Sequence, residues 1–265
     1  MNRLEDVSLF SEQALAGRTI VITGAGRGLG RSMATALAHV GADLVLVARH
    51  TEEINETASA IKRLGAGKIL TVRADVTSVS DINNLVERSM AEFGKIDVLV
   101  NNAGLNGGHV RHNFEDIPTD QWMNMLNTNV TSVFLVTQAV GRVMLERGAG
   151  KVINIASVRA VRSVSQGLCY SVSKAAVIQM TRALALEWGK RGVTVNCLAP
   201  GSLDLHPGSN DADHAKLNEE RERHIPMGHV GRLEDACGAL IYLASSASDY
   251  VNGATLFVDG GISAG

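Results

Sequence analysis

Short apolar runs alternate with longer amphipathic segments along almost the whole chain. The apolar runs are nearly continuous rather than interrupted at every second position, which is typical of parallel strands covered on both faces. They predict strands at 18–23, 43–48, 69–73, 96–101, 151–156, 193–198 and 255–258. The amphipathic segments predict helices at 28–40, 52–64, 79–93, 119–147, 168–190 and 233–244, and the polar stretch 213–223 predicts another.

This regular alternation predicts a single-domain α/β fold over residues 1–265, a doubly wound, Rossmann-like parallel sheet with helices on both faces. No linker, low-complexity segment or internal repeat divides the chain. The largest irregular stretch covers about 202–231. Long insertions in compact domains are often active-site lids, so we expect a substrate lid there.

Composition and charge narrow the classes of partner. The 265 residues carry a formal net charge of −2, which gives no electrostatic reason to expect nucleic acid or an anionic membrane. No apolar run is long enough to span a bilayer, and the polar start of the chain lacks the pattern of a signal peptide. Three widely spaced cysteines fit a reducing cytoplasm. No histidine or cysteine spacing indicates a metal site.

A glycine-rich turn joins the first predicted strand to the first predicted helix. It reads Thr23-Gly24-Ala25-Gly26-Arg27-Gly28-Leu29-Gly30. In a doubly wound sheet, this position brings a pyrophosphate to the N-terminus of a helix, and glycines let the backbone approach the phosphates. The turn is not followed by the lysine of a P-loop. We therefore expect it to bind a dinucleotide.

The end of the second predicted strand bears on the choice between NAD and NADP. It reads Val47-Ala48-Arg49-His50, without the acidic residue that binds the ribose 2′-hydroxyl in NAD enzymes. A guanidinium at Arg49 pairs well with a 2′-phosphate, and Arg27 belongs to the neighbouring glycine turn. The sequence favours NADP(H), with NAD(H) as the alternative.

Three residues further along the chain carry candidate chemistry. Tyr170 and Lys174 are four positions apart on a predicted helix and so share a face. A tyrosine hydroxyl is a weak acid, and a nearby ammonium favours its ionised form, which makes Tyr170 a candidate general acid/base. Ser157 follows a strand at the edge where open sheets bind ligands, and it can hydrogen-bond a substrate oxygen. Together with the glycine turn, these residues predict hydride transfer to a carbonyl or from an alcohol.

The order of these motifs resembles the short-chain dehydrogenase/reductase family over about residues 17–261. The glycine turn resembles its T-G-x-x-x-G-x-G motif, and residues 101–104 resemble its N-N-A-G motif. The resemblance implies that Asn129 is catalytic together with Ser157, Tyr170 and Lys174. It also implies, with Arg27 and Arg49, a set of cofactor-binding residues: Gly24, Gly28, Leu29, Gly30, Asp75, Val76, Asn102, Ala103, Gly104, Tyr170, Lys174, Pro200 and Gly201.

The activity that the resemblance implies is NADP(H)-dependent interconversion of a carbonyl and a secondary alcohol in a small molecule. An NAD-dependent sugar, sugar-acid or alcohol dehydrogenase and a 3-oxoacyl-thioester reductase remain alternatives. A non-catalytic dinucleotide sensor is disfavoured because the whole catalytic set is present. Relatives are commonly homotetramers that pack through the two long helices, and we expect the same here.

Two details near the expected substrate site leave questions open. Relatives often carry a threonine shortly after the proline and glycine at 200–201, whereas this chain continues with Ser202, which leaves the cofactor contacts of that loop undecided. Basic residues cluster nearby. We hypothesise that one of them receives a carboxylate or polyhydroxylated substrate, the candidates being Arg159, Arg162, His109, Arg111 and His112.

Overall fold

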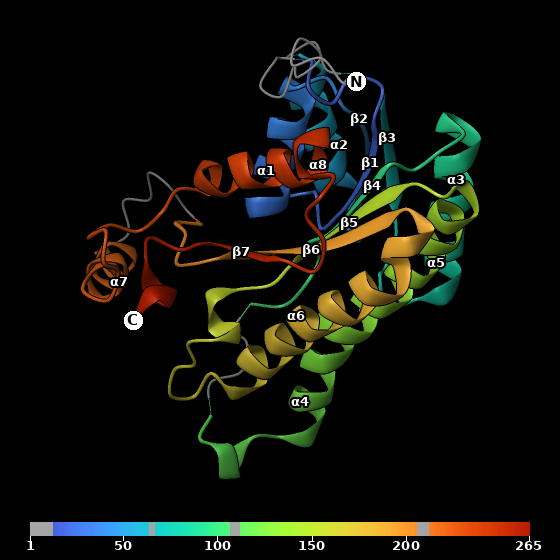
Figure 1. Cartoon of the computed structure of the whole chain (residues 1–265). Helices are drawn as coiled ribbons and strands as arrows, with labels where there is room; N and C mark the ends of the chain where they lie inside the picture. Colours follow the sequence, from blue (N-terminus) through green and yellow to red (C-terminus); the bar gives the residue numbers. More distant parts are fainter. Residues whose placement is uncertain (1–12, 64–66, 107–111, 206–211) are drawn as a thin grey trace.

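A seven-stranded parallel sheet forms the centre of the molecule, in the order β3-β2-β1-β4-β5-β6-β7 (Figure 1). The computed structural model describes residues 13–63, 67–106, 112–205 and 212–265. The strands are β1 (Thr19–Thr23), β2 (Asp43–Ala48), β3 (Ile69–Arg73), β4 (Val98–Asn101), β5 (Gly150–Ile155), β6 (Val193–Pro200) and β7 (Thr255–Val258). Every pairing between neighbouring strands is parallel, which confirms the predicted doubly wound sheet.

Helices cover both faces of the sheet. The described helices are α1 (Gly28–His39), α2 (Thr51–Lys62), α3 (Val79–Phe93), α4 (Thr119–Leu126), α5 (Ser132–Arg147), α6 (Leu168–Trp188), α7 (Ala212–Glu222) and α8 (Cys237–Ala244). In β1, Ile20 and Ile22 pack with α1, α2 and α8, whereas Val21 packs with α3, α5 and α6. Side chains thus alternate between two apolar cores, and for this reason the strands are apolar throughout.

The strand order reverses at β1, which pairs with β2 on one side and β4 on the other. The connections that follow β1 and β4 leave toward opposite faces of the sheet. The carboxyl ends of these two strands therefore border a crevice, which is where doubly wound folds bind ligands. The glycine turn follows β1, and the N-N-A-G motif begins at the last residue of β4. The topology therefore brings the two predicted motifs to one crevice.

The predicted helix over 119–147 is interrupted. Between α4 and α5, residues Asn127–Thr131 form a π-helical turn. Such a turn holds one residue more than an α-helical turn and often lies at a functional site. The helix predicted over 233–244 likewise begins as a 3₁₀ turn, Leu233–Ala236, before α8.

A chain of buried amides and hydroxyls ties the middle of the sheet to two helices. Asn101 of β4 donates from Nδ2 to Thr137 Oγ1 at 2.8 Å and to Asn154 Oδ1 at 2.9 Å. Asn154 of β5 donates to Thr181 Oγ1 at 2.9 Å. Thr137 belongs to α5 and Thr181 to α6. These bonds satisfy polar groups inside the core and fix α5 and α6 relative to the strands.

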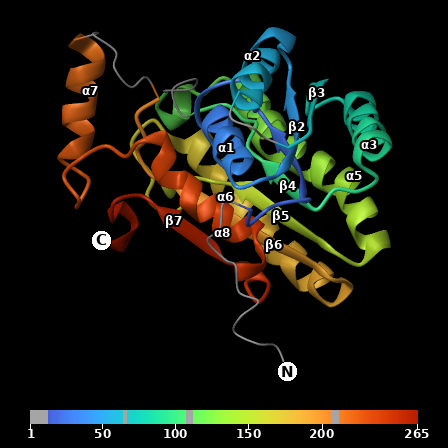
Figure 2. The same cartoon turned by 90° about the horizontal axis from the view of Figure 1, so that it is seen from above.

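The segment around α7 lies apart from the two helical layers, as both views show (Figure 1, Figure 2). Its helix is strongly polar, with the sequence ADHAKLNEERE. None of the described helices is both long and apolar enough to cross a membrane.

Candidate active site

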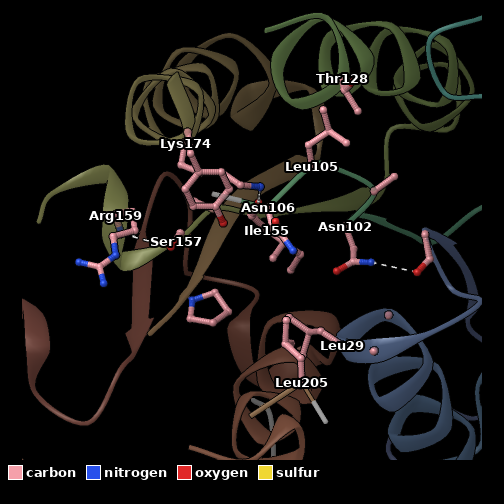
Figure 3. Close-up of a pocket in the computed structure, with 18 of the residues that line it drawn as sticks. Leu29, Asn102, Leu105, Asn106, Thr128, Ile155, Ser157, Arg159, Lys174 and Leu205 are labelled. Atoms are coloured by element: carbon pink, nitrogen blue, oxygen red, sulfur yellow. Dashed lines mark hydrogen bonds between the residues drawn. The ribbon is translucent and has the colours of Figure 1, made fainter. Parts of the chain in front are cut away.

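A cavity of about 1090 Å³ runs along the carboxyl ends of the strands. Its walls come from the glycine turn, the ends of β2, β3 and β4, the segment after β5, the start of α6, the loop after β6, and α7. Ser157, Arg159 and Lys174 gather at one end of the close-up, and Leu29 and Asn102 lie toward the other (Figure 3). One continuous cavity therefore joins the predicted nucleotide-binding and catalytic residues.

The glycine turn is braced by the N-N-A-G motif. Asn102 donates from Nδ2 to the carbonyl oxygens of Thr23 at 2.9 Å and Gly24 at 3.2 Å. Thr23 Oγ1 accepts the backbone N–H groups of Asn102 and Ala103, both at 3.0 Å. A Cβ at Gly30 would collide with the carbonyl oxygen of Gly24 and would lie 2.6 Å from Asn102 Nδ2, so only glycine permits this approach.

The shape of this turn fits a pyrophosphate. Gly24 has a φ of +68°, which aims the backbone in a direction that other residues rarely adopt. Helix α1 begins at Gly28 without an acidic residue in its own first turn, and its positive end faces the cavity. Gly24, Gly28, Leu29 and Gly30 all line the cavity, as predicted for cofactor contacts. A phosphate group is well accommodated at such a helix N-terminus.

Charged side chains mark the end of the cavity beyond this turn. Arg27 and Arg49 line it and are exposed. Asp75 and Val76, which follow β3, line it as well. The hydroxyl and then the backbone N–H of Thr77 lower the pKa of the Asp75 carboxyl, and the Arg49 and Arg73 charges add to this effect. Asp75 is therefore ionised at neutral pH.

Glu53 of α2 also lines this end of the cavity, and the sequence reasoning missed it. At the end of β2, where an acidic residue was expected for an NAD enzyme, the chain carries Ala48. The structure brings an acid to the same region from the first turn of the following helix. Acidic residues are common in the first helical turn because they offset the helix dipole, so the sequence alone gives no reason to single this one out.

The predicted catalytic residues lie around the other end. Lys174 is only 6% exposed, and its Nζ donates to the carbonyl oxygen of Ile155 at 2.9 Å. The same Nζ is 5.7 Å from the centre of the Tyr170 ring. Ser157 is 7% exposed, and its Oγ accepts the backbone N–H of Arg159 at 3.2 Å. Ser157, Tyr170 and Lys174 all line the cavity, so the structure brings this predicted set together.

Asn129 lies behind the cavity wall, in the π-helical turn, and is not among the lining residues. Its Oδ1 accepts the N–H of Leu105 at 2.7 Å, and its Nδ2 donates to the Leu105 carbonyl at 3.0 Å. Nδ2 also donates to Ser173 Oγ at 3.1 Å, and Ser173 donates to the Tyr170 carbonyl at 2.7 Å. Asn129 therefore joins the loop after the N-N-A-G motif to the helix that carries Tyr170. Ser173 was not predicted.

The end of β6 and the loop after it border the part of the cavity where the family pattern predicts the nicotinamide. Pro200, Gly201 and Ser202 line the cavity. The N–H of Gly201 donates to the carbonyl of Val258 at 2.9 Å, and the carbonyl of Ser202 accepts the N–H of Gly231 at 3.0 Å. These bonds hold the backbone of the loop although the threonine usual in relatives is replaced.

The basic residues near the expected substrate site differ in whether they line the cavity. Arg159 lines the cavity, whereas Arg162 is exposed and is not a lining residue. His112 is half-buried and is not a lining residue either. His109 and Arg111 lie outside the described residues. A further lining cation, Arg221 of α7, was not predicted because only the tertiary path brings that helix to the cavity.

Metal ligands do not converge in the part of the chain that the structure describes, where no group of three His, Cys, Asp or Glu side chains is placed to hold an ion. The three cysteines, Cys169, Cys197 and Cys237, are buried and free. Burial raises the pKa of the Cys197 thiol to about 11, so none of these observations points to thiolate chemistry.

Comparisons with known proteins agree with this geometry. A family model described as enoyl-(acyl carrier protein) reductase matches residues 24–263. The 2-dehydro-3-deoxy-D-gluconate 5-dehydrogenase of Bacillus subtilis is 39% identical over 249 residues, which cover 94% of this chain and 95% of that protein. Gluconate 5-dehydrogenase of Gluconobacter oxydans is 36% identical, with 96% of each chain covered.

The similarity also holds for the three-dimensional structure of a solved relative. Gluconate 5-dehydrogenase from Burkholderia cenocepacia, in complex with NADP and tartrate, superposes with a TM-score of 0.86 at 35% identity and covers 96% of this chain and 98% of that one. The chain belongs to the short-chain dehydrogenase/reductase family. It is an NAD(P)-dependent oxidoreductase of the type that acts on CH–OH groups.

Proposed function

We propose that this short-chain dehydrogenase/reductase interconverts a hydroxyl and a keto group in a sugar acid. The observation that carries this proposal is the charge of the catalytic part of the cavity. From β5 to α7, all charged lining residues among those described are cationic: Arg159, Lys174 and Arg221. An anionic substrate is favoured by such a wall, and a planar guanidinium suits a carboxylate.

The comparisons support the same substrate class. The relatives named above are sugar-acid dehydrogenases, and the solved structure holds tartrate, a small hydroxy diacid. They favour the sugar-acid alternative over an unspecified carbonyl reductase. The lining of the catalytic part combines aliphatic residues such as Val164, Leu203 and Leu217 with serine, glutamine, arginine and lysine side chains, and these polar groups favour a hydroxylated acid over a long apolar acyl chain.

In the proposed reaction, the nicotinamide cofactor supplies or accepts the hydride. Ser157 donates its hydroxyl to the substrate oxygen and holds it toward Tyr170. The Tyr170 hydroxyl gives a proton to that oxygen in reduction and removes it in oxidation. Lys174 places a positive charge 5.7 Å from the centre of the Tyr170 ring and offers its remaining N–H groups to the nicotinamide ribose. Asn129 positions α6 through Ser173.

The cofactor preference that we propose is NADP(H). Arg27 and Arg49 line the cavity beside the glycine turn, where the adenosine ribose of a bound cofactor would lie. No acidic residue stands at the end of β2, since Ala48 occupies that position. Replacing Arg49 with alanine should weaken NADPH binding far more than NADH binding.

The remaining expectations concern the surroundings of the site. We propose that the segment 202–231 is a lid, because Leu205, Leu217 and Arg221 from this segment line the cavity. A single catalytic domain, a homotetramer and a cytoplasmic location remain predictions. Sedimentation of the purified protein tests the assembly.

The activity is tested by following nicotinamide absorbance with gluconate, 2-dehydro-3-deoxygluconate and 5-ketogluconate. Glucose and sorbitol serve as uncharged comparisons. We expect turnover with a sugar acid and little with the uncharged compounds. Tyr170→Phe should bind the cofactor normally and lose turnover. Full turnover by this variant would refute the assignment of Tyr170.

Arg159 and Arg162 form a matched pair for testing substrate charge. A hydrogen bond to a charged group contributes about 1.5–3 kcal/mol, so Arg159→Ala should raise KM for a sugar acid by roughly 10- to 100-fold. Arg162→Ala should leave KM unchanged because Arg162 does not line the cavity. Equal effects of the two substitutions on KM would show that Arg159 does not contact the substrate.

A further inference from the structure

Glu53 lies directly against the glycine turn. It is the third residue of α2 and is half-buried. A Cβ built on Gly26 would lie 2.7 Å from Glu53 Cβ and 2.8 Å from its Oε2, so the carboxylate covers the turn only because residue 26 has no side chain. One helical turn later, Thr57 donates its hydroxyl to the Gly26 carbonyl at 3.1 Å. The start of α2 is thus fixed against the turn.

Among the described residues, none of the ion pairs involves Glu53. Arg27 and Arg49, which line the same part of the cavity, are exposed. Asp75 lines it too, and its lowered pKa keeps it ionised. This part of the cavity is therefore lined by two guanidinium groups, which favour a 2′-phosphate, and by an equal number of carboxylates.

We propose that Glu53 is a specificity-determining residue that opposes binding of a 2′-phosphate and so limits the preference for NADP(H) over NAD(H). This inference rests on the proposed nucleotide site at the glycine turn. A phosphate monoester is close to a dianion at neutral pH, so a nearby carboxylate repels it. The ribose 2′-hydroxyl of NAD(H) carries no charge and does not meet this repulsion. Repulsion of the pyrophosphate is common to both cofactors and cancels in the ratio of their Kd values, so only the effect on the 2′-phosphate changes the preference.

Isothermal titration calorimetry with NADP⁺ and NAD⁺, in the absence of substrate, tests the proposal. Glu53→Gln removes the charge and keeps the shape of the side chain. We expect it to increase the ratio of the NAD⁺ Kd to the NADP⁺ Kd by a factor of about three to ten. The gain should shrink in about 0.5 M salt, because salt screens partly exposed charges. Glu53→Ala should change the ratio in the same direction.

Glu52→Gln is the matched control. Glu52 belongs to the same helical turn but is exposed and does not line the cavity, so its removal should leave the ratio within twofold. An unchanged or lowered ratio in both Glu53 variants would overturn the proposal, as would an equal increase in Glu52→Gln. If the unaltered protein bound neither nucleotide, the proposed cofactor site would fail as well. Thermal unfolding of each variant verifies that it is folded.

Discussion

Replacing Asn129 with aspartate should destabilise the protein in a pH-dependent way. The side chain is 1% exposed and uses both ends of its amide. Its Nδ2 donates to the Leu105 carbonyl and to Ser173 Oγ, and the Ser173 hydroxyl is already directed at the Tyr170 carbonyl. An ionised carboxylate at position 129 would turn an oxygen toward these acceptors with no donor between them. A protonated carboxyl group would restore one donor.

The protonated form is therefore favoured in the folded variant, and its carboxyl pKa is raised. A shift of about three pKa units, at the lower end for a fully buried carboxyl group, corresponds to about 4 kcal/mol. A raised folded-state pKa means that stability is retained below about pH 4, the value in the unfolded chain, and is lost as the pH rises through about 7. At about 2–4 °C per kcal/mol for a domain of this size, Tm should fall by roughly 8–16 °C.

Differential scanning calorimetry at pH 5 and pH 8 measures this effect. The Tm deficit of Asn129→Asp relative to the unaltered protein should be small at pH 5 and large at pH 8. Asn127→Asp is the control, since Asn127 belongs to the same π-helical turn but is exposed. An equal deficit at both pH values would show that the amide donor of Asn129 is not needed in the way the structure indicates.

Three other predictions follow from single sites. Gly30→Ala places a Cβ against the Gly24 carbonyl oxygen and 2.6 Å from Asn102 Nδ2, so the resulting overpacking of about 1–3 kcal/mol should lower Tm and weaken NADP⁺ binding; normal binding would contradict the close approach. The pKa of Asp75 is lowered chiefly by the Thr77 hydroxyl, so the stability it adds is present above about pH 4 and lost as the pH falls through the folded-state pKa. Urea unfolding of Thr77→Val should therefore show a deficit at pH 7 that narrows at pH 3, and a constant deficit would argue against this linkage. Cys197 has a pKa raised to about 11 and is fully buried, so it should react with a thiol reagent at pH 8 only after denaturation, whereas rapid labelling of the native protein would refute its burial.

The strands and their parallel arrangement were predictable because burial on both faces makes each strand a continuous apolar run. The interruption of the helix over 119–147 was not. A π-helical turn adds one residue but leaves the surrounding pattern amphipathic, so Asn127–Thr131 look like ordinary helix in the sequence. The 3₁₀ start before α8 was missed for a similar reason, since the two helix types share apolar spacing over one turn.

Motif order predicted many of the residues that line the cavity, although not all of them. Ser157 follows the carboxyl end of β5, and the start of α6 brings Tyr170 and Lys174 to the same edge of the sheet, where Lys174 Nζ donates to the Ile155 carbonyl. Glu53 and Arg221 were missed because their place in the cavity depends on packing between distant segments. The hypothesis that named both Arg159 and Arg162 is supported only for Arg159, because the short turn after Ser157 directs the two to different surroundings.

The π-helical turn has a consequence for changes in chain length. Deleting one residue from Asn127–Thr131 would let α4 run into α5 as an unbroken α-helix, with an acceptable backbone throughout. A π-helical turn takes up its extra residue locally, so the deletion would leave the helices on either side close to their present rotation about the axis. The loss would be local, because the turn that places Asn129 against Leu105 and Ser173 would tighten and draw the amide away from these partners. The extra residue in this stretch therefore serves the position of one buried amide rather than the packing of the two helices against the sheet.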